Sequence, residues 1–172
     1  MATWVPTTNQ LGLQPITTTS TTQVQPLGCV IEAYDQDTSG QGNGEFIYLL
    51  GCANTVVGSV VTYNATTFQT SIALGTANQG GTVAVAMSAN VAGQYGWYQI
   101  GGQASVKKTA VIVSAAKKVY LVSSTVTGNG RISAASVTGK QILGARSANL
   151  TAVASATSTV MVMIDRPHLP SV

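Results

Sequence analysis

Short runs of strand-forming residues separated by turn sequences recur along this chain, and they restrict the possible fold more than any other feature. Residues 82–88 alternate small polar with apolar side chains, and residues 95–100 combine three aromatic residues with an isoleucine. Two such runs joined by a connection that contains Asn and Gly are typical of a β-hairpin. We therefore expect the segment 82–106 to be a central hairpin. The side chains expected in its interior are Val83, Val85, Met87, Trp97 and Ile100.

The rest of the chain shows the same pattern, with turn signals about every 8–12 residues, which predicts an all-β sandwich or barrel. No long stretch has apolar residues at the i, i+3, i+4, i+7 spacing of an amphipathic helix. Residues 126–131 are expected to form a turn around Asn129-Gly130. The further strands are predicted at residues 27–34, 46–50, 59–63, 68–73, 110–113, 117–123, 132–137, 141–147 and 158–164.

The N-terminal 25 residues differ from the remainder, because they carry no charge and are rich in Thr, Gln and Pro without any lasting period. Such a segment predicts an extended arm that is ordered only where something holds it. Trp4 either inserts into a groove of a neighbouring molecule or folds back on its own domain. We therefore divide the chain into an arm (1–25), a β-barrel-like domain (26–167) and a short C-terminal tail (168–172).

Charge is scarce: 8% of the residues are charged, against about 25% in a typical soluble domain. Because charge keeps monomers apart, this composition predicts a surface that is largely occupied by other subunits, or alternatively a Thr/Ser-rich exported protein. The net charge of +3 comes from scattered residues, so direct binding of nucleic acid is not expected. No membrane partner is expected, since no apolar run approaches the length of a transmembrane segment. The first ten residues lack the basic start and apolar run of a secretory signal, so no signal peptide is expected.

Catalytic patterns are weak. His168 is the single histidine and stands five residues from the C-terminus, so the sequence offers no held nucleophile–base pair. We therefore expect no enzyme and no cofactor. Two buried free thiols are favoured at Cys29 and Cys52, with a disulfide between them as the alternative, and the pair matches no metal or redox motif.

One acidic loop resembles the start of a calcium-binding loop. Asp35 and Asp37 have the spacing of the first oxygen ligands, with Gly40 at the sixth position, but Glu45 stands one residue too early and the flanks are strand-like. The favoured interpretation is a hairpin loop rich in Asx and Gly residues. A cation site formed by Asp35, Asp37 and Glu45 remains the alternative.

Three segments carry a resemblance to a known family. They are residues 26–28 (PLG) with 44–51 (GEFIYLLG), residues 83–86 (VAVA) with 94–102 (QYGWYQIGG), and residues 160–167 (VMVMIDRP). Together they resemble the capsid decoration, or cement, proteins of tailed bacteriophages. The resemblance runs as a loose pattern from about Pro26 to Pro167.

The resemblance implies a small β-barrel or β-tulip-like domain that forms a homotrimer on the outside of the virion capsid, is made in the host cytoplasm and has no catalytic residues. Its partners would be the major capsid protein and copies of itself. The capsid-binding residues expected in the arm are Trp4, Val5, Leu11, Leu13 and Ile16, and the expected subunit contacts are Tyr95, Trp97 and Tyr98. Two alternatives stay open: a tail-tube or other phage structural subunit, and a carbohydrate- or cell-surface-binding β-module that uses the same three aromatic residues as a stacking platform.

Overall fold

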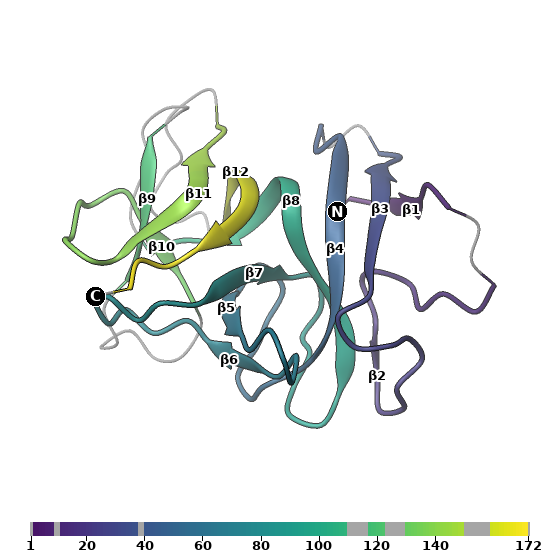
Figure 1. Cartoon of the computed structure of the whole chain (residues 1–172). Coiled ribbons are helices and arrows are strands. Elements are labelled where there is room, and N and C mark those ends of the chain that lie inside the picture. Colours follow the sequence, from purple (N-terminus) through teal and green to yellow (C-terminus); the bar gives the residue numbers. More distant parts are fainter. Residues whose placement is uncertain are drawn as a thin grey trace.

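A computed structural model describes residues 2–8, 11–37, 40–109, 117–122, 130–149 and 159–171, and this part of the chain contains strands and no helix (Figure 1). All pairings between the named strands are antiparallel, and the resulting sheet is not closed into a barrel. The all-β prediction is confirmed. The strands are β1 (Trp4–Pro6), β2 (Thr19–Ser20), β3 (Val30–Asp35), β4 (Asn43–Leu50), β5 (Val60–Tyr63), β6 (Thr70–Ile72), β7 (Thr82–Ala86), β8 (Tyr95–Lys107), β9 (Lys118–Leu121), β10 (Ile132–Ser133), β11 (Gln141–Ser147) and β12 (Thr159–His168).

The long strand β8 joins the two halves of the molecule. Its first part pairs with β4, and its second part pairs with β12 over residues 101–107. Figure 1 shows β8 curving between β4 and β12. The register with β4 shifts between Gln99 and Gly101, directly before the pair Gly101-Gly102 at the bend. Gly102 has a positive φ of 87°, and a Cβ there would lie 2.2 Å from the backbone oxygen of Asn43, so only glycine fits this position.

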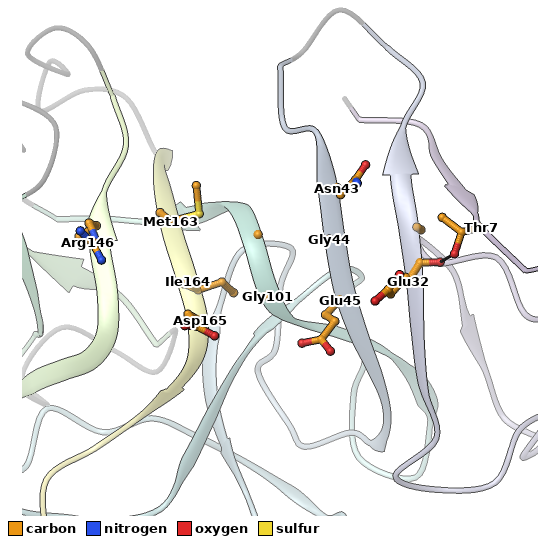
Figure 2. Close-up of a pocket in the computed structure, with 12 residues that line it drawn as sticks. Thr7, Glu32, Asn43, Gly44, Glu45, Gly101, Arg146, Met163, Ile164 and Asp165 are labelled. Carbon is orange, nitrogen blue, oxygen red and sulfur yellow. Dashed lines mark hydrogen bonds between the residues drawn. The ribbon is translucent and has the colours of Figure 1, made fainter.

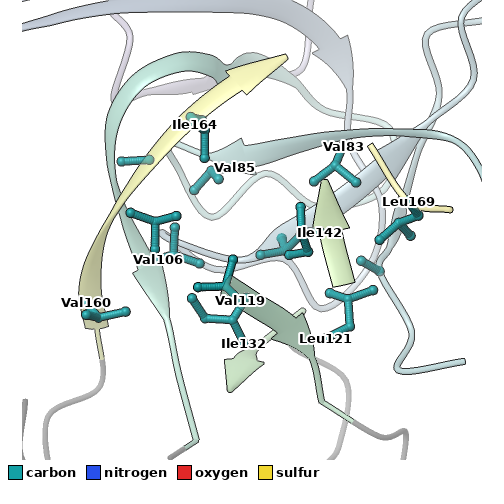
Figure 3. Packing of buried hydrophobic residues seen from close by; sticks show 14 residues of the cluster. Val83, Val85, Val106, Val119, Leu121, Ile132, Ile142, Val160, Ile164 and Leu169 are labelled. Carbon is teal, nitrogen blue, oxygen red and sulfur yellow. The ribbon is translucent and has the colours of Figure 1, made fainter. Parts of the chain in front are cut away.

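Three apolar clusters fill the space around β8. One lies between β1, β3, β4 and the first part of β8, and it contains Trp4, Phe46, Tyr48 and Trp97. A second, rich in Val and Ile, lies between the second part of β8 and strands β7, β9, β11 and β12 (Figure 3). The third packs β4, β5, β7 and β8 together on the other face. β-branched side chains suit such pleated, half-buried surfaces, which explains the dominance of Val and Ile in the second cluster.

The central hairpin is present as expected, because β7 pairs with β8 through Val85 opposite Gln99 and Ala86 opposite Tyr98. β8 ends at Lys107, one residue beyond the expected hairpin segment 82–106. Two features differ from the expectation. The N-terminal segment pairs with the domain through β1 and β2, and the predicted tail packs on it through Leu169, which is 4% exposed. The predicted strand at 110–113 and most of the turn at 126–131 lie outside the described residues.

Candidate interface at the N-terminal groove

A buried amide fastens the N-terminal segment to the domain. Gln14 is 5% exposed. Its Nε2 donates to the backbone oxygens of Thr18 (2.8 Å) and Tyr95 (3.2 Å), and its Oε1 accepts from the hydroxyl of Tyr48 (2.6 Å). The backbone oxygen of Gln14 also accepts from Nε1 of Trp97 at 2.9 Å. Because every polar atom of this amide has a partner, its burial costs little.

Two apolar anchors accompany this amide. Trp4 is 8% exposed and meets Phe46 edge-on, with ring centroids 4.8 Å apart. Ile16 is 3% exposed in the same cluster. The segment is therefore folded back over residues 2–8 and 11–25, and of the two alternatives for Trp4 the structure has the one in which it packs on its own domain. Neither anchor side chain is available to a partner while the segment stays in place.

The five residues predicted to bind a capsid nevertheless lie together. They surround one groove of about 550 Å³, whose lining is completed by Pro6, Thr8, Gln14 and Pro15. Leu11 at its rim is fully exposed, and Val5 and Leu13 are half-buried. None of these described lining residues is charged. The groove is thus suited to uncharged, partly apolar surface, and a charged group entering it would lose hydration without gaining a counter-charge.

The three aromatic residues predicted as subunit contacts do not form one surface. Trp97 and Tyr98 are both 0% exposed, and as neighbours on β8 they point to opposite faces, into different apolar clusters. The Tyr98 hydroxyl accepts from Nδ2 of Asn90 at 3.0 Å. Only Tyr95 is half-buried, stacked on Tyr48. Trp97 and Tyr98 are therefore buried inside the folded chain, and the three rings do not form one exposed stacking platform.

Burial also controls the ionisation of two tyrosines. It raises the pKa of Tyr98 to about 12, against the opposing effect of hydrogen bonds that include the one from Asn90. Burial likewise raises the pKa of Tyr48, while backbone hydrogen bonds near Val24 oppose it. Loss of a proton from either hydroxyl would place a charge inside the apolar clusters.

The acidic residues of the loop before β4 do not converge on a common point. One carboxylate oxygen of Asp35 accepts from the backbone N–H of Asp37, and Asp37 itself accepts from the hydroxyl of Thr3 at 2.8 Å. Glu45 pairs with Arg166 at 2.7 Å. In the part of the chain that the structure describes, no three His, Cys, Asp or Glu side chains are grouped to hold a metal. The cation site at Asp35, Asp37 and Glu45 is therefore not formed.

A second hollow, of about 490 Å³, lies where β8 bends (Figure 2). Glu32 is opposite Glu45, and both Glu45 and Asp165 are opposite Gly101, so three carboxylates lie in one row across four strands. Arg146 also lines the hollow, and hydrogen bonding to Glu45 raises the pKa of Arg166 beside it. The sequence signal for this cleft was the glycine pair inside a strand pattern, which often marks a bulge.

Arg166 pairs with Glu45 and Arg146 also lines the cleft, so these two guanidinium groups offset most of the negative charge of its three carboxylates. No His, Cys or Ser stands among its described lining residues.

Comparisons of this chain with protein-family models, with curated proteins and with solved structures found no match. Within the described residues, no helix is long and apolar enough to span a membrane.

Proposed function

We propose that this chain is a structural virion protein that binds the outside of a phage capsid. It stabilises the shell by bridging subunits of the major capsid protein, and it acts as a homotrimer without enzymatic activity. The proposal rests on the sequence resemblance to capsid decoration proteins together with the N-terminal groove. The groove is the main observation in support of the proposal, because the five side chains of the uncharged N-terminal segment that were expected to bind a capsid all line it.

The groove supports shell binding through its exposed rim. Complete burial of one leucine side chain contributes about 1.5–3 kcal/mol, and Leu11 exposes its whole side chain. A single such contact is weak. A decoration protein, however, acts through many copies and through several contacts in each copy, so modest individual interfaces add up to a stabilised shell.

The outer face of β3 supports self-association. Val30 and Tyr34 are 42% and 40% exposed, and they alternate along the strand with buried residues, with the exposed Glu32 between them on the same face. A surface with so few charges offers little electrostatic resistance to contact between copies. This face takes the place of Trp97 and Tyr98 as the proposed contact between subunits.

The two alternative functions, a carbohydrate-binding module and a tail-tube subunit, differ from the proposal in what they require of the structure. A carbohydrate-binding module no longer has its aromatic platform, since two of the three rings are buried. A tail-tube subunit would polymerise, whereas a decoration protein would form a closed trimer. Light scattering on the eluate of a size-exclusion column separates these outcomes.

Co-sedimentation with undecorated shells of the phage that encodes the chain tests the proposal. We expect the protein to sediment with the shells and to raise the temperature at which they disrupt. Leu11→Glu should abolish sedimentation, because it places a charge at the rim of the groove. Leu74→Glu is the matched control at another exposed leucine and should sediment like the unmodified protein. If the unmodified protein neither sediments nor raises the disruption temperature, the proposed function is wrong.

A further inference from the structure

Strand β1 leaves one row of its backbone groups unpaired. The backbone N–H of Gln36 donates to Thr3, and that of Thr7 donates to Glu32, while Trp4 is opposite Asp35. In an antiparallel ladder the bonded pairs alternate, so Thr3, Val5 and Thr7 bond to β3. The backbone groups of Trp4 and Pro6 therefore point away from it.

This edge has a defined hydrogen-bonding capacity. Trp4 presents one N–H and one C=O, and Pro6 presents a C=O without an N–H. Among the described strands β1 pairs with β3 alone and ends the main strand order of the sheet, and Figure 1 shows it beyond β3, on the side away from β4. An antiparallel strand placed beside it would form two bonds with Trp4 and a third with the carbonyl of Pro6.

The N-terminal groove runs along this same edge. Trp4, Val5 and Pro6 form one wall, and Leu11, Leu13 and Ile16 are among the residues that complete it. A strand added at the edge would therefore place alternate side chains over apolar surface. Backbone bonds would give such a complex its geometry, and the groove would select the side chains.

We infer that the free edge of β1 accepts an extended, uncharged segment of a partner by antiparallel strand addition. The identification of that partner as the major capsid protein rests on the proposed function, whereas the strand addition itself rests on the edge and the groove. The lack of charge in the described lining determines the chemistry of the occupant, because a charged side chain there would be desolvated without a counter-charge. Pro6 limits the contact to a short segment, since it offers no N–H for a longer ladder.

Amide hydrogen exchange, resolved to single residues by mass spectrometry, tests the inference on the intact chain. The probe is the peptide Ac-Thr-Val-Thr-Val-Thr-NH2 at millimolar concentration. We expect exchange at the Trp4 amide to slow by about tenfold or more as this N–H gains a partner. The Val5 amide, which is already bonded to β3, should change little. A peptide of the same sequence with an N-methyl group at every residue, which has no backbone N–H on either edge, is the matched control and should give no protection.

Each result decides a separate question. Strand addition is wrong if the exchange rate of the Trp4 amide stays the same in the presence of the peptide. It is also wrong if the N-methylated peptide protects this amide equally. The same measurement with undecorated shells then identifies the partner. Shell binding with an unprotected Trp4 amide overturns strand addition by the shell protein and leaves the proposed function standing. Protection by the peptide without any shell binding supports strand addition and overturns the proposed function.

Discussion

At the scale of single residues, the buried side chain of Gln14 connects the N-terminal segment to the domain. Its side chain joins β4, β8 and the segment 11–25 through three hydrogen bonds. The sequence gives no sign of this role, since a glutamine in a Thr- and Gln-rich stretch looks like any other polar residue there. Its burial follows from the position of Tyr48, which is distant in sequence.

We expect Gln14→Ala to destabilise the protein by about 2–3 kcal/mol, because the Tyr48 hydroxyl and two backbone oxygens lose a buried partner. The measurement is the midpoint of denaturant unfolding. Gln23→Ala is the matched control, since Gln23 is exposed and bonds only to the neighbouring Gln25, and it should change stability by less than about 0.5 kcal/mol. Equal midpoints for the two variants would contradict the assigned role of Gln14.

Tyr98 makes stability depend on alkaline pH. Its pKa is raised from 10.0 in the unfolded chain to about 12 in the folded protein. The folded state therefore holds the proton more tightly, and this contribution is fully present below pH 10 and is lost as pH rises through 12. We expect the unmodified protein to lose about 2 kcal/mol through this residue between these pH values. Tyr98→Phe should show a smaller loss in urea unfolding measured across the range, and an unchanged slope would contradict the prediction.

At the scale of the elements, the sequence predicted the β7–β8 hairpin because both strands carry a strong local pattern. The expected segment 82–106 included the glycine pair of β8, but its pattern did not reveal the bend, because a glycine pair normally interrupts a strand and here forms a bend within one. It also missed β1 and β2, whose two or three residues are too short for any period. Their pairing depends on contacts with β3 and β8 that local sequence does not reveal.

The candidate sites likewise depend on contacts between segments that are distant in the sequence. The five residues of the groove were predicted from their apolar character within an uncharged segment, and the structure brings them together. Which of them are buried depends on distant partners such as Phe46. The row formed by Glu32, Glu45 and Asp165 was missed because it depends on strand register across β3, β4, β8 and β12.

The bend of β8 provides a test at this scale. We expect Gly102→Ala to destabilise the protein by more than about 2 kcal/mol, because a Cβ at a positive φ would also overlap the Asn43 carbonyl. Gly93→Ala is the control, since Gly93 has a similar φ of 77° with no atom within 4 Å of its Cβ position. It should cost only about 1 kcal/mol. Thermal unfolding compares the two, and equal losses would show that the bend tolerates a side chain.

At the scale of the whole molecule, the two halves differ in what they offer a partner. The half that contains β1, β3 and β4 carries the groove, the free edge of β1 and the exposed residues of β3. The other half contributes the Val- and Ile-rich cluster (Figure 3), whose interior holds a void of only about 10 Å³. The two halves are joined by the bent strand β8 and by the third cluster, which packs β4, β5, β7 and β8 together.

The scarcity of charge leads to the last prediction, which concerns salt. With eight basic and five acidic residues in the chain and an uncharged groove, shell binding should depend on apolar burial and backbone hydrogen bonds. Raising NaCl from about 0.1 M to about 1 M shortens the Debye length from about 10 Å to about 3 Å. We therefore expect the shell affinity to change by less than about threefold in sedimentation assays. Under the same conditions Leu11→Lys, which adds a charge at the rim, should bind weakly and respond to salt. A loss of tenfold or more for the unmodified protein would mean that scattered Lys and Arg residues carry the binding instead, as they do for proteins that release counterions from a polyanion.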